Sequence, residues 1–327
     1  MNPTLILLAA ASFPTVLAVT PRVASLMLKR GILGVDVHKA SRPKIPEMCG
    51  VSLWVGVLPP ILIASAVDPA HRALYAAFIL TGLTAGLIGL IDDLKPLHPV
   101  LKPLLTALAA APILILKVYE PYPYLPFIGA TRLTIVYPIL IPISLAVTSN
   151  AVNMMDVFNG VMPLTSLIAF GTAFAALTLL GRAPESYLAL CMAAALAAYY
   201  LYNRYPAKVF SGDSGSLFVG ACLGAVAVLG RIEAVMVVAL MPQILNAFYG
   251  LSSVGRLYER REVKARPVEV QPDGRLDVSG KKNAPLTLTR LILAEGPLHE
   301  KEVVKVMAAL AILSSALAAA TYMLTPW

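Results

Sequence analysis

The chain has 327 residues, of which 58% are hydrophobic and only 13% are charged, about half of the roughly 25% that is usual for soluble domains. This composition excludes an ordinary soluble enzyme, a disordered protein and a coiled coil, because the apolar runs are longer than an aqueous core can bury. The 26 Lys and Arg outnumber the 18 Asp and Glu, which gives a net charge of +8. In a membrane protein this excess indicates first basic cytoplasmic loops and then an anionic ligand, and we expect no nucleic-acid partner.

A membrane-spanning helix needs about 20 mostly apolar residues, and the sequence contains ten such runs separated by polar or Pro- and Gly-rich breaks. We therefore predict an all-α polytopic membrane protein that forms a single integral membrane domain over residues 1–327. The predicted helices are residues 3–27, 48–66, 73–91, 101–119, 133–150, 160–180, 186–202, 214–230, 232–252 and 303–324.

The basic residues predict how these helices are oriented. The first run has no Lys or Arg before Arg22, whereas Lys29 and Arg30 follow it, which places the N-terminus outside and the next loop in the cytoplasm. Since every crossing changes sides, ten helices place both termini outside. The loops predicted to be cytoplasmic, which carry most of the Lys and Arg, are 28–47, 92–100, 151–159, 203–213 and 253–302.

The last of these loops is long enough to fold by itself. Val268 and Val270 before a Pro-Asp-Gly turn, and Leu276 and Val278 after it, alternate with polar residues, which predicts a small β-hairpin. The apolar stretch 285–293 that follows predicts a short helix along the membrane interface.

Acidic and amide side chains are costly inside membranes and need partners, so their positions are the strongest indication of function. Here they gather at helix ends that the predicted topology places on the cytoplasmic face. Three of them recur at i, i+3 and i+6, which predicts a shared helical face. The residues concerned are Asp92 and Asp93 at the end of the third helix, Lys102 at the start of the fourth, Asn150, Asn153 and Asp156 near the end of the fifth, and Asp213 at the start of the eighth.

Each cluster also has a simpler explanation. The paired Asp residues fit a solvated helix end, Asp213 fits a helix N-cap, and the Asn residues fit hydrogen bonds between helices. Together on one face, however, the clusters gather four carboxylates that repel one another unless a cation binds. Oxygen ligands without His or Cys indicate Mg²⁺ or Mn²⁺ rather than zinc, and Mg²⁺ held by few carboxylates implies a phosphorylated substrate.

Four blocks of the sequence carry a resemblance to a known family. They are 36–47 (DVHKASRPKIPE), 89–93 (GLIDD) followed by Lys102, 150–153 (NAVN) running on to 159–160 (NG), and 210–216 (FSGDSGS). In these blocks the chain resembles the polyprenyl-phosphate N-acetylhexosamine-1-phosphate transferases, and most closely the eukaryotic and archaeal branch that makes GlcNAc-pyrophosphoryl-dolichol. The resemblance implies transfer of GlcNAc-1-phosphate from UDP-GlcNAc to dolichyl phosphate, with release of UMP.

The resemblance also implies roles for single residues. It implies Mg²⁺ ligation by Asn153 and Asp213, and phosphate binding by Lys102. It implies a part in catalysis for three acidic residues, each as a base, as the partner of the lysine or as support of the metal site. These residues are Asp92, Asp93 and Asp156. The residues that it implies in substrate binding are Glu47 near the sugar, Asn159 and Phe210 at the uracil, Asn150, and Lys264 and Arg266 in the basic stretch at the pyrophosphate. Which of Arg261, Lys264 and Arg266 contacts the pyrophosphate is left open.

The last cytoplasmic loop bears on the choice of donor. The bacterial murein-precursor branch carries a histidine cluster there, whereas the 4 histidines of this chain are scattered and a basic stretch, 260–266, stands in its place. This favours UDP-GlcNAc over a muramyl-pentapeptide donor. The same chemistry with another UDP-amino sugar or with undecaprenyl phosphate is the nearest alternative. A membrane transporter is the alternative from a different class, but it predicts ionisable groups near the bilayer midplane rather than at helix ends.

We therefore expect an integral protein of the cell membrane in a prokaryote, or of the endoplasmic reticulum membrane in a eukaryote, with its active site on the cytoplasmic face. The expected partners are UDP-GlcNAc, a polyprenyl or dolichyl phosphate and the lipid bilayer. The oligomeric state is left open, and a homodimer is one option.

Overall fold

The computed structural model describes residues 3–257, 265–281 and 283–327, and it is mostly helical. The α-helices are α1 (Pro3–Ala10), α2 (Ser12–Lys29), α3 (Val51–Val67), α4 (Arg72–Leu94), α5 (Leu101–Ala107), α6 (Ala111–Ile115), α7 (Tyr137–Met155), α8 (Val161–Leu179), α9 (Ala183–Asn203), α10 (Gly212–Leu229), α11 (Glu233–Ala239), α12 (Met241–Val254), α13 (Leu288–Ile292) and α14 (Glu300–Met323). The 3₁₀ turns are η1 (Pro69–His71), η2 (Leu108–Ala110) and η3 (Leu293–Glu295).

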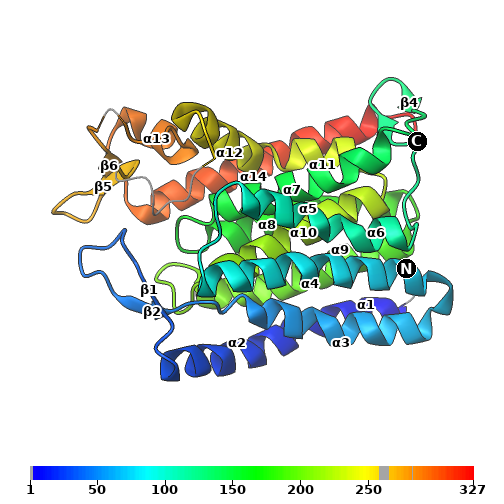
Figure 1. Cartoon of the computed structure of the whole chain (residues 1–327), viewed down its shortest axis with the longest axis horizontal. Coiled ribbons are helices and arrows are strands. Elements are labelled where there is room, and N and C mark those ends of the chain that lie inside the picture. The colour runs from blue at the N-terminus through cyan, green and yellow to red at the C-terminus, as the bar shows by residue number, and fades with distance from the viewer. Residues whose placement is uncertain (1–2, 258–264, 282) are drawn as a thin grey trace.

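Three short antiparallel strand pairs complete the described structure. They are β1 (Leu33–Val35) with β2 (Lys44–Pro46), β3 (Tyr124–Leu125) with β4 (Gly129–Ala130), and β5 (Val268–Val270) with β6 (Leu276–Val278). The long helices run roughly along one direction. Both described chain ends lie at one end of this bundle, and the pairs β1–β2 and β5–β6 lie at the other (Figure 1).

Hydropathy and length single out six described helices that can cross a membrane, or up to seven if the bent pair α11–α12 counts as one span. Each of the ten predicted segments overlaps a helix, but α3 and Leu101–Ile115 are shorter than a full span. Helix α9 is long enough to span a membrane but is not among the candidate spans, because its tyrosines lower its mean hydropathy. Ten crossings therefore remain a prediction. The six candidate spans are Pro3–Lys29, Pro69–Leu94, Tyr137–Met155, Val161–Leu179, Gly212–Leu229 and Glu300–Met323.

Three predicted helices are interrupted, which corrects the sequence analysis. The predicted helix 232–252 is the pair α11 and α12, bent by 67°. The predicted helix 101–119 is α5, η2 and α6, and the first predicted helix divides into α1 and α2. Proline lies in the first turn of both α6 and α12. Because proline lacks an N–H and clashes with the preceding turn, it favours a helix start over a helix interior.

Helix α10 forms the centre of the bundle, and every residue from Ser214 to Leu229 is buried. Glycines let its neighbours approach closely. A Cβ atom at Gly89 of α4 would lie 2.3 Å from the carbonyl oxygen of Asp213, and one at Gly220 would lie 2.6 Å from the Cα atom of Ser149 in α7. The chain segments that carry the predicted functional residues are therefore packed backbone against backbone.

The pair β5–β6 occupies the residues whose alternation predicts a hairpin. Gly274 in its turn has φ +82°, a conformation that glycine adopts without steric cost. Val268 and Leu276 of the pair contribute to a second apolar core, shared with the end of α7 and the start of α14. The predicted interfacial helix 285–293 is observed as the shorter α13, whose Thr287 cap accepts a hydrogen bond from the Arg290 backbone at 3.3 Å. The side of the membrane on which this region lies stays a prediction.

Candidate active site

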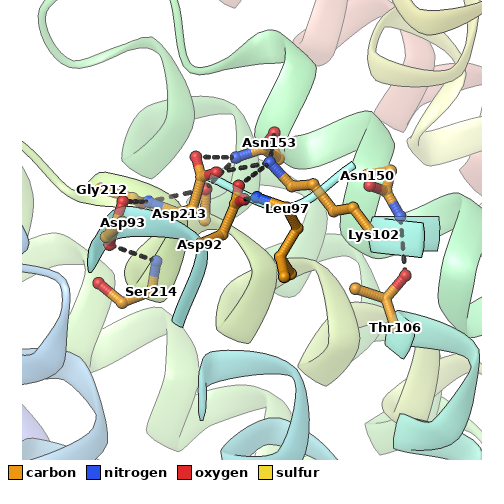
Figure 2. A network of polar contacts seen from close by, with 11 residues as sticks. Asp92, Asp93, Leu97, Lys102, Thr106, Asn150, Asn153, Gly212, Asp213 and Ser214 are labelled. Carbon is orange, nitrogen blue, oxygen red and sulfur yellow. Dashed lines mark hydrogen bonds and ion pairs between the residues drawn. The ribbon is translucent and has the colours of Figure 1, made fainter. Parts of the chain in front are cut away.

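Four helix ends meet around the side chain of Lys102 (Figure 2). Its ammonium group at the start of α5 lies 2.7 Å from Oδ2 of Asp92, at the end of α4, and 2.5 Å from Oδ2 of Asp213, in the first turn of α10. Lys102 and Asp92 are each only 5% exposed. Because a buried charge is stable only when it is paired, the two carboxylates and the ammonium hold one another in place.

Asn153 joins the end of α7 to this group. Its Nδ2 donates to Oδ1 of Asp213 at 2.7 Å and to Oγ of Ser216 at 2.8 Å, and its Oδ1 accepts from Lys102 at 3.4 Å. Asp213 thus has one carboxylate oxygen on Lys102 and the other on Asn153. We call Asp92, Lys102, Asn153 and Asp213 the Lys102 network.

Asp93 makes different contacts from its neighbour Asp92. Its two oxygens accept from the backbone N–H groups of Asp213 at 2.8 Å and Ser214 at 3.0 Å, at the N-terminus of α10. Helix N-termini have free N–H groups that favour a negative charge. Gly212 has φ +67°, and a Cβ atom there would lie 2.6 Å from Oδ2 of Asp93. Asp93 therefore fixes the position of Asp213 through its backbone.

Asn150 lies beside the Lys102 network, and Asp156 follows the helix that carries Asn150 and Asn153. Asn150 donates to Oγ1 of Thr106 at 2.9 Å, beyond the Lys102 stem in Figure 2. Helix α7 ends at Met155, and Asp156 follows it with φ −78° and ψ 70°. The predicted helical face shared by Asn150, Asn153 and Asp156 is therefore wrong at its last member, because the helix ends one residue earlier.

Asn159 belongs to a second polar group, which contains residues that the sequence analysis left out of its candidate set. Its Nδ2 donates to Asp36, its backbone N–H donates to Glu300 at 2.9 Å, and its Oδ1 accepts from Lys39 at 2.7 Å. Lys39 also pairs with Asp36 and Glu300. The family-like block 36–47 already contains Asp36 and Lys39, whereas Glu300 carries no comparable signal.

Glu47 and Phe210 come together against Gly34. A Cβ atom on Gly34 would lie 2.9 Å from Cδ2 of Phe210 and 3.1 Å from Oε2 of Glu47. The backbone N–H of Phe210 donates to Pro46 at 2.8 Å, and its carbonyl accepts from Cys49 at 2.9 Å. These bonds join the start of α10 to β2, so the Lys102 network lies at the bundle end opposite both termini (Figure 1).

The two basic residues expected at the pyrophosphate stand apart from these groups. Arg266 is exposed just before β5 and forms no ion pair or hydrogen bond with another residue that the structure describes. Lys264 lies outside the described residues.

The donor atoms of the Lys102 network fit a hard cation. No group of three or more His, Cys, Asp and Glu with the geometry of a metal site occurs among residues 3–257, 265–281 and 283–327. Mg²⁺, however, needs only one or two protein carboxylates when phosphate oxygens and water complete its shell. Asp213 and Asn153 offer carboxylate and amide oxygens. The ammonium of Lys102 lies against Asp213, which shows that a positive charge is stabilised at this position.

Known proteins are similar to this chain over the segment that contains these residues. The sequence profile described as glycosyl transferase family 4 matches residues 75–231, a segment that contains the whole Lys102 network. A putative UDP-N-acetylglucosamine–dolichyl-phosphate N-acetylglucosaminephosphotransferase of Saccharolobus solfataricus is 27% identical over 85% of this chain and 84% of its own length. A putative glycosyltransferase of Methanocaldococcus jannaschii is 31% identical over 84% of this chain and 82% of its own length.

Bacterial proteins are similar over a smaller part of the chain. A probable undecaprenyl-phosphate N-acetylglucosaminyl 1-phosphate transferase of Bacillus subtilis is 26% identical over 72% of this chain and 65% of its own length.

Proposed function

The chain belongs to glycosyl transferase family 4, and from this membership we propose that it transfers GlcNAc-1-phosphate from UDP-GlcNAc to a polyprenyl phosphate of the dolichyl type. An oxygen of the lipid phosphate forms a bond to the β-phosphorus of the donor. The bond between that phosphorus and the oxygen bridging to the α-phosphate breaks, and UMP leaves with the bridging oxygen. The products are UMP and GlcNAc-pyrophosphoryl-lipid.

The observation that carries this proposal is the buried Lys102 between Asp92 and Asp213. Phosphoryl transfer depends on positioning and on neutralising negative charge more than on covalent chemistry by the protein. Two carboxylates hold the ammonium of Lys102 in a fixed position, and Mg²⁺ bound at Asp213 and Asn153 would supply the further positive charge that the phosphates need. A phosphate monoester has a second pKa near 6, so the acceptor is already a nucleophile and needs no strong base.

The other residues divide into distinct tasks. Asp213 and Asn153 would hold Mg²⁺, which supplies charge neutralisation at the pyrophosphate. Asp92 orients Lys102, and Asp93 fixes the start of α10. Asn150 lies one helical turn before Asn153 in α7, and Asp156 directly follows the end of that helix; we assign both to the support of this site.

Glu47, Phe210 and Asn159 are the residues of this chain that we assign to the sugar and the uridine. Glu47 and Phe210 lie together against Gly34, so an aromatic face and a carboxylate border the same space. Arg266 and Lys264 belong to the basic stretch that we assign to the pyrophosphate, because a guanidinium engages two phosphate oxygens at once.

The protein is then an integral membrane enzyme with its active site on the cytoplasmic face and both termini outside. Supporting this orientation, the Lys102 network and the described chain ends lie at opposite ends of the bundle (Figure 1). The basic loops of the sequence fall at the network's end, as the positive-inside rule requires of a cytoplasmic face.

A donor competition assay tests this function. The full chain in dioleoyl phosphatidylcholine vesicles with dolichyl phosphate and Mg²⁺ receives equal amounts of UDP-GlcNAc and UDP-MurNAc-pentapeptide, and the lipid products are identified by mass spectrometry. GlcNAc-pyrophosphoryl-dolichol is the expected product. A predominantly muramyl product would contradict the proposed donor, and a lipid carrying GlcNAc on a single phosphate would contradict the reaction itself. Undecaprenyl phosphate in place of dolichyl phosphate then measures the acceptor preference.

A further inference from the structure

A cavity of about 420 Å³ lies between α8, α9, the segment 204–208 and the start of α14. Its wall combines four basic side chains and two tyrosines with aliphatic side chains. We call it the α9–α14 pocket. The lining residues are Asn159, Leu164, Tyr200, Leu201, Arg204, Tyr205, Pro206, Lys208, Lys301, Val304, Lys305 and Ala308.

The charge of the α9–α14 pocket is uncompensated within the described structure. Arg204, Lys208, Lys301 and Lys305 are all exposed, and none of them forms an ion pair with another described residue. Lys301 and Lys305 are four residues apart and so lie on one face of α14. No Asp or Glu lines the pocket. Four cations around one cavity repel one another, and an anion between them relieves that repulsion.

Tyr205 organises part of this wall. The ammonium group of Lys301 lies over its ring, 4.8 Å from the centroid, and that of Lys39 lies 4.7 Å from the same centroid. Lys39 is itself held by Asp36 and Asn159. Through Tyr205, Lys301 of the pocket is thus placed beside the second polar group.

The pocket lies where two candidate membrane spans, Val161–Leu179 and Glu300–Met323, begin. Lys301 and Lys305 lie in the first turns of the candidate span Glu300–Met323, where long basic side chains extend toward the interface. Leu164 and Val304 come from the candidate spans Val161–Leu179 and Glu300–Met323, and together with Leu201 near the end of α9 they supply an apolar wall. Basic pockets between helices at this level are suited to anionic lipid head groups.

The α9–α14 pocket is separate from the catalytic residues. No member of the Lys102 network lines it, and the residue that it shares with the candidate substrate set is Asn159. Asn159 is 4% exposed, and its Oδ1 accepts from the backbone N–H of Ala207 at 2.9 Å, so its side chain is fixed where the pocket adjoins the second polar group. A ligand bound to the basic residues of this pocket therefore lies against residues other than those of the Lys102 network.

We propose that the α9–α14 pocket binds the phosphate head group of an anionic bilayer phospholipid, with its acyl chains along the aliphatic wall. The ligand chemistry that this pocket fits is a phosphate ester attached to a hydrocarbon chain. A polyprenyl phosphate has the same chemistry, but the acceptor must reach the Lys102 network, and no residue of that network lines this pocket.

The test is native mass spectrometry of the full chain, released from micelles that contain one defined additive. The additives are dioleoyl phosphatidylglycerol, dioleoyl phosphatidylcholine, farnesyl phosphate and inorganic phosphate. We expect a retained phosphatidylglycerol adduct and no comparable adduct with the other three. Lys301→Gln/Lys305→Gln should weaken phosphatidylglycerol retention by about tenfold or more, because each Lys near the membrane surface contributes separately to the attraction.

Two further variants make the result decisive. Lys208→Gln/Lys305→Gln leaves the Lys301–Tyr205 contact intact and should weaken retention similarly. Lys29→Gln/Arg30→Gln removes two exposed charges at the end of α2, outside the pocket, and should change nothing. Equal retention of phosphatidylcholine, preferential retention of farnesyl phosphate or of inorganic phosphate, or full retention by both pocket variants would overturn the proposal. The readout needs no transferase activity, so it is independent of the proposed function.

Discussion

Lys102 holds two carboxylates together from a position that water scarcely reaches. Lys102→Met keeps most of the side-chain volume and removes the charge, so Asp92 and Asp213 lose their common partner. We expect turnover to fall by about two orders of magnitude or more, and the free energy of unfolding to fall by about 3–5 kcal/mol, as when one member of a buried pair is removed. Steady-state kinetics and thermal unfolding measure the two effects. Lys29→Met, at an exposed position, is the matched control, and a Lys102→Met enzyme with the kinetics of that control would rule out a role for the ammonium.

Asp213 and Asp93 should respond differently to the same substitution. Asp213→Asn removes a charge from the assigned Mg²⁺ ligand, so we expect turnover to fall by about 10²-fold or more and the Mg²⁺ concentration for half-maximal activity to rise. Asp93→Asn leaves one acceptor oxygen for the N-terminus of α10, and should instead lower the free energy of unfolding by about 1 kcal/mol with little change in Mg²⁺ dependence. Mg²⁺ titrations of both variants distinguish the roles. Identical Mg²⁺ dependence in the two would contradict this division.

The sequence predicts which polar residues cluster better than it predicts their contacts. Residues at helix ends on one predicted face do converge, as Asp92, Lys102 and Asp213 do. The separate contacts of Asp92 and Asp93 depend on which backbone amides each one meets. Asp92 accepts from Leu97, shortly after α4, whereas Asp93 accepts from two amides at the start of α10, about 120 residues away. Glu300 shows the same limit, because it lies within the predicted loop 253–302 and is recognisable only once α14 is packed beside Asn159.

Close packing of α4 against α10 gives a prediction at the level of elements. Gly89→Ala would place a Cβ atom 2.3 Å from the carbonyl oxygen of Asp213, in a backbone that cannot yield locally. We expect a loss of about 1–3 kcal/mol in the free energy of unfolding and a loss of turnover, because α4 carries Asp92. Gly171→Ala in α8, where the added Cβ atom has no neighbour within 4 Å, should be neutral or slightly stabilising. Comparable losses of stability and turnover in both variants would show that the close contact between α4 and α10 is not the cause of the Gly89→Ala effect.

Apolar runs are enough to locate the helices, because twenty apolar residues have few other stable structures in a bilayer. They do not locate breaks within a run. The 67° bend between α11 and α12, and the end of α7 at Met155 rather than at the predicted residue 150, do not show in the hydropathy. They depend on proline position and on tertiary contacts, so helix existence was predictable and helix continuity was not.

The orientation of the whole molecule is testable by labelling single cysteines. Cys49, Cys191 and Cys222 are buried and form no disulfide, so they can be replaced to give a clean background. Cysteines at the exposed positions Ala40, His98 and Lys208 should react with a membrane-impermeant maleimide only from the cytoplasmic side. Cysteines at Ala70 and Arg132 should react only from outside. Labelling of any of these positions from the opposite side would contradict the proposal that the predicted site residues lie on one cytoplasmic face.

The central claim is that the bond broken lies between the two phosphates of the donor. UDP-GlcNAc labelled with ³²P at the β-phosphate, incubated with the purified full chain, dolichyl phosphate and Mg²⁺, distinguishes the possible reactions directly. The account predicts that the label moves into the lipid fraction, that unlabelled UMP appears in equal amount, and that Lys102→Met abolishes both. Label that remains on the nucleotide as UDP, with GlcNAc transferred alone, or an absence of any UMP release, would contradict the account.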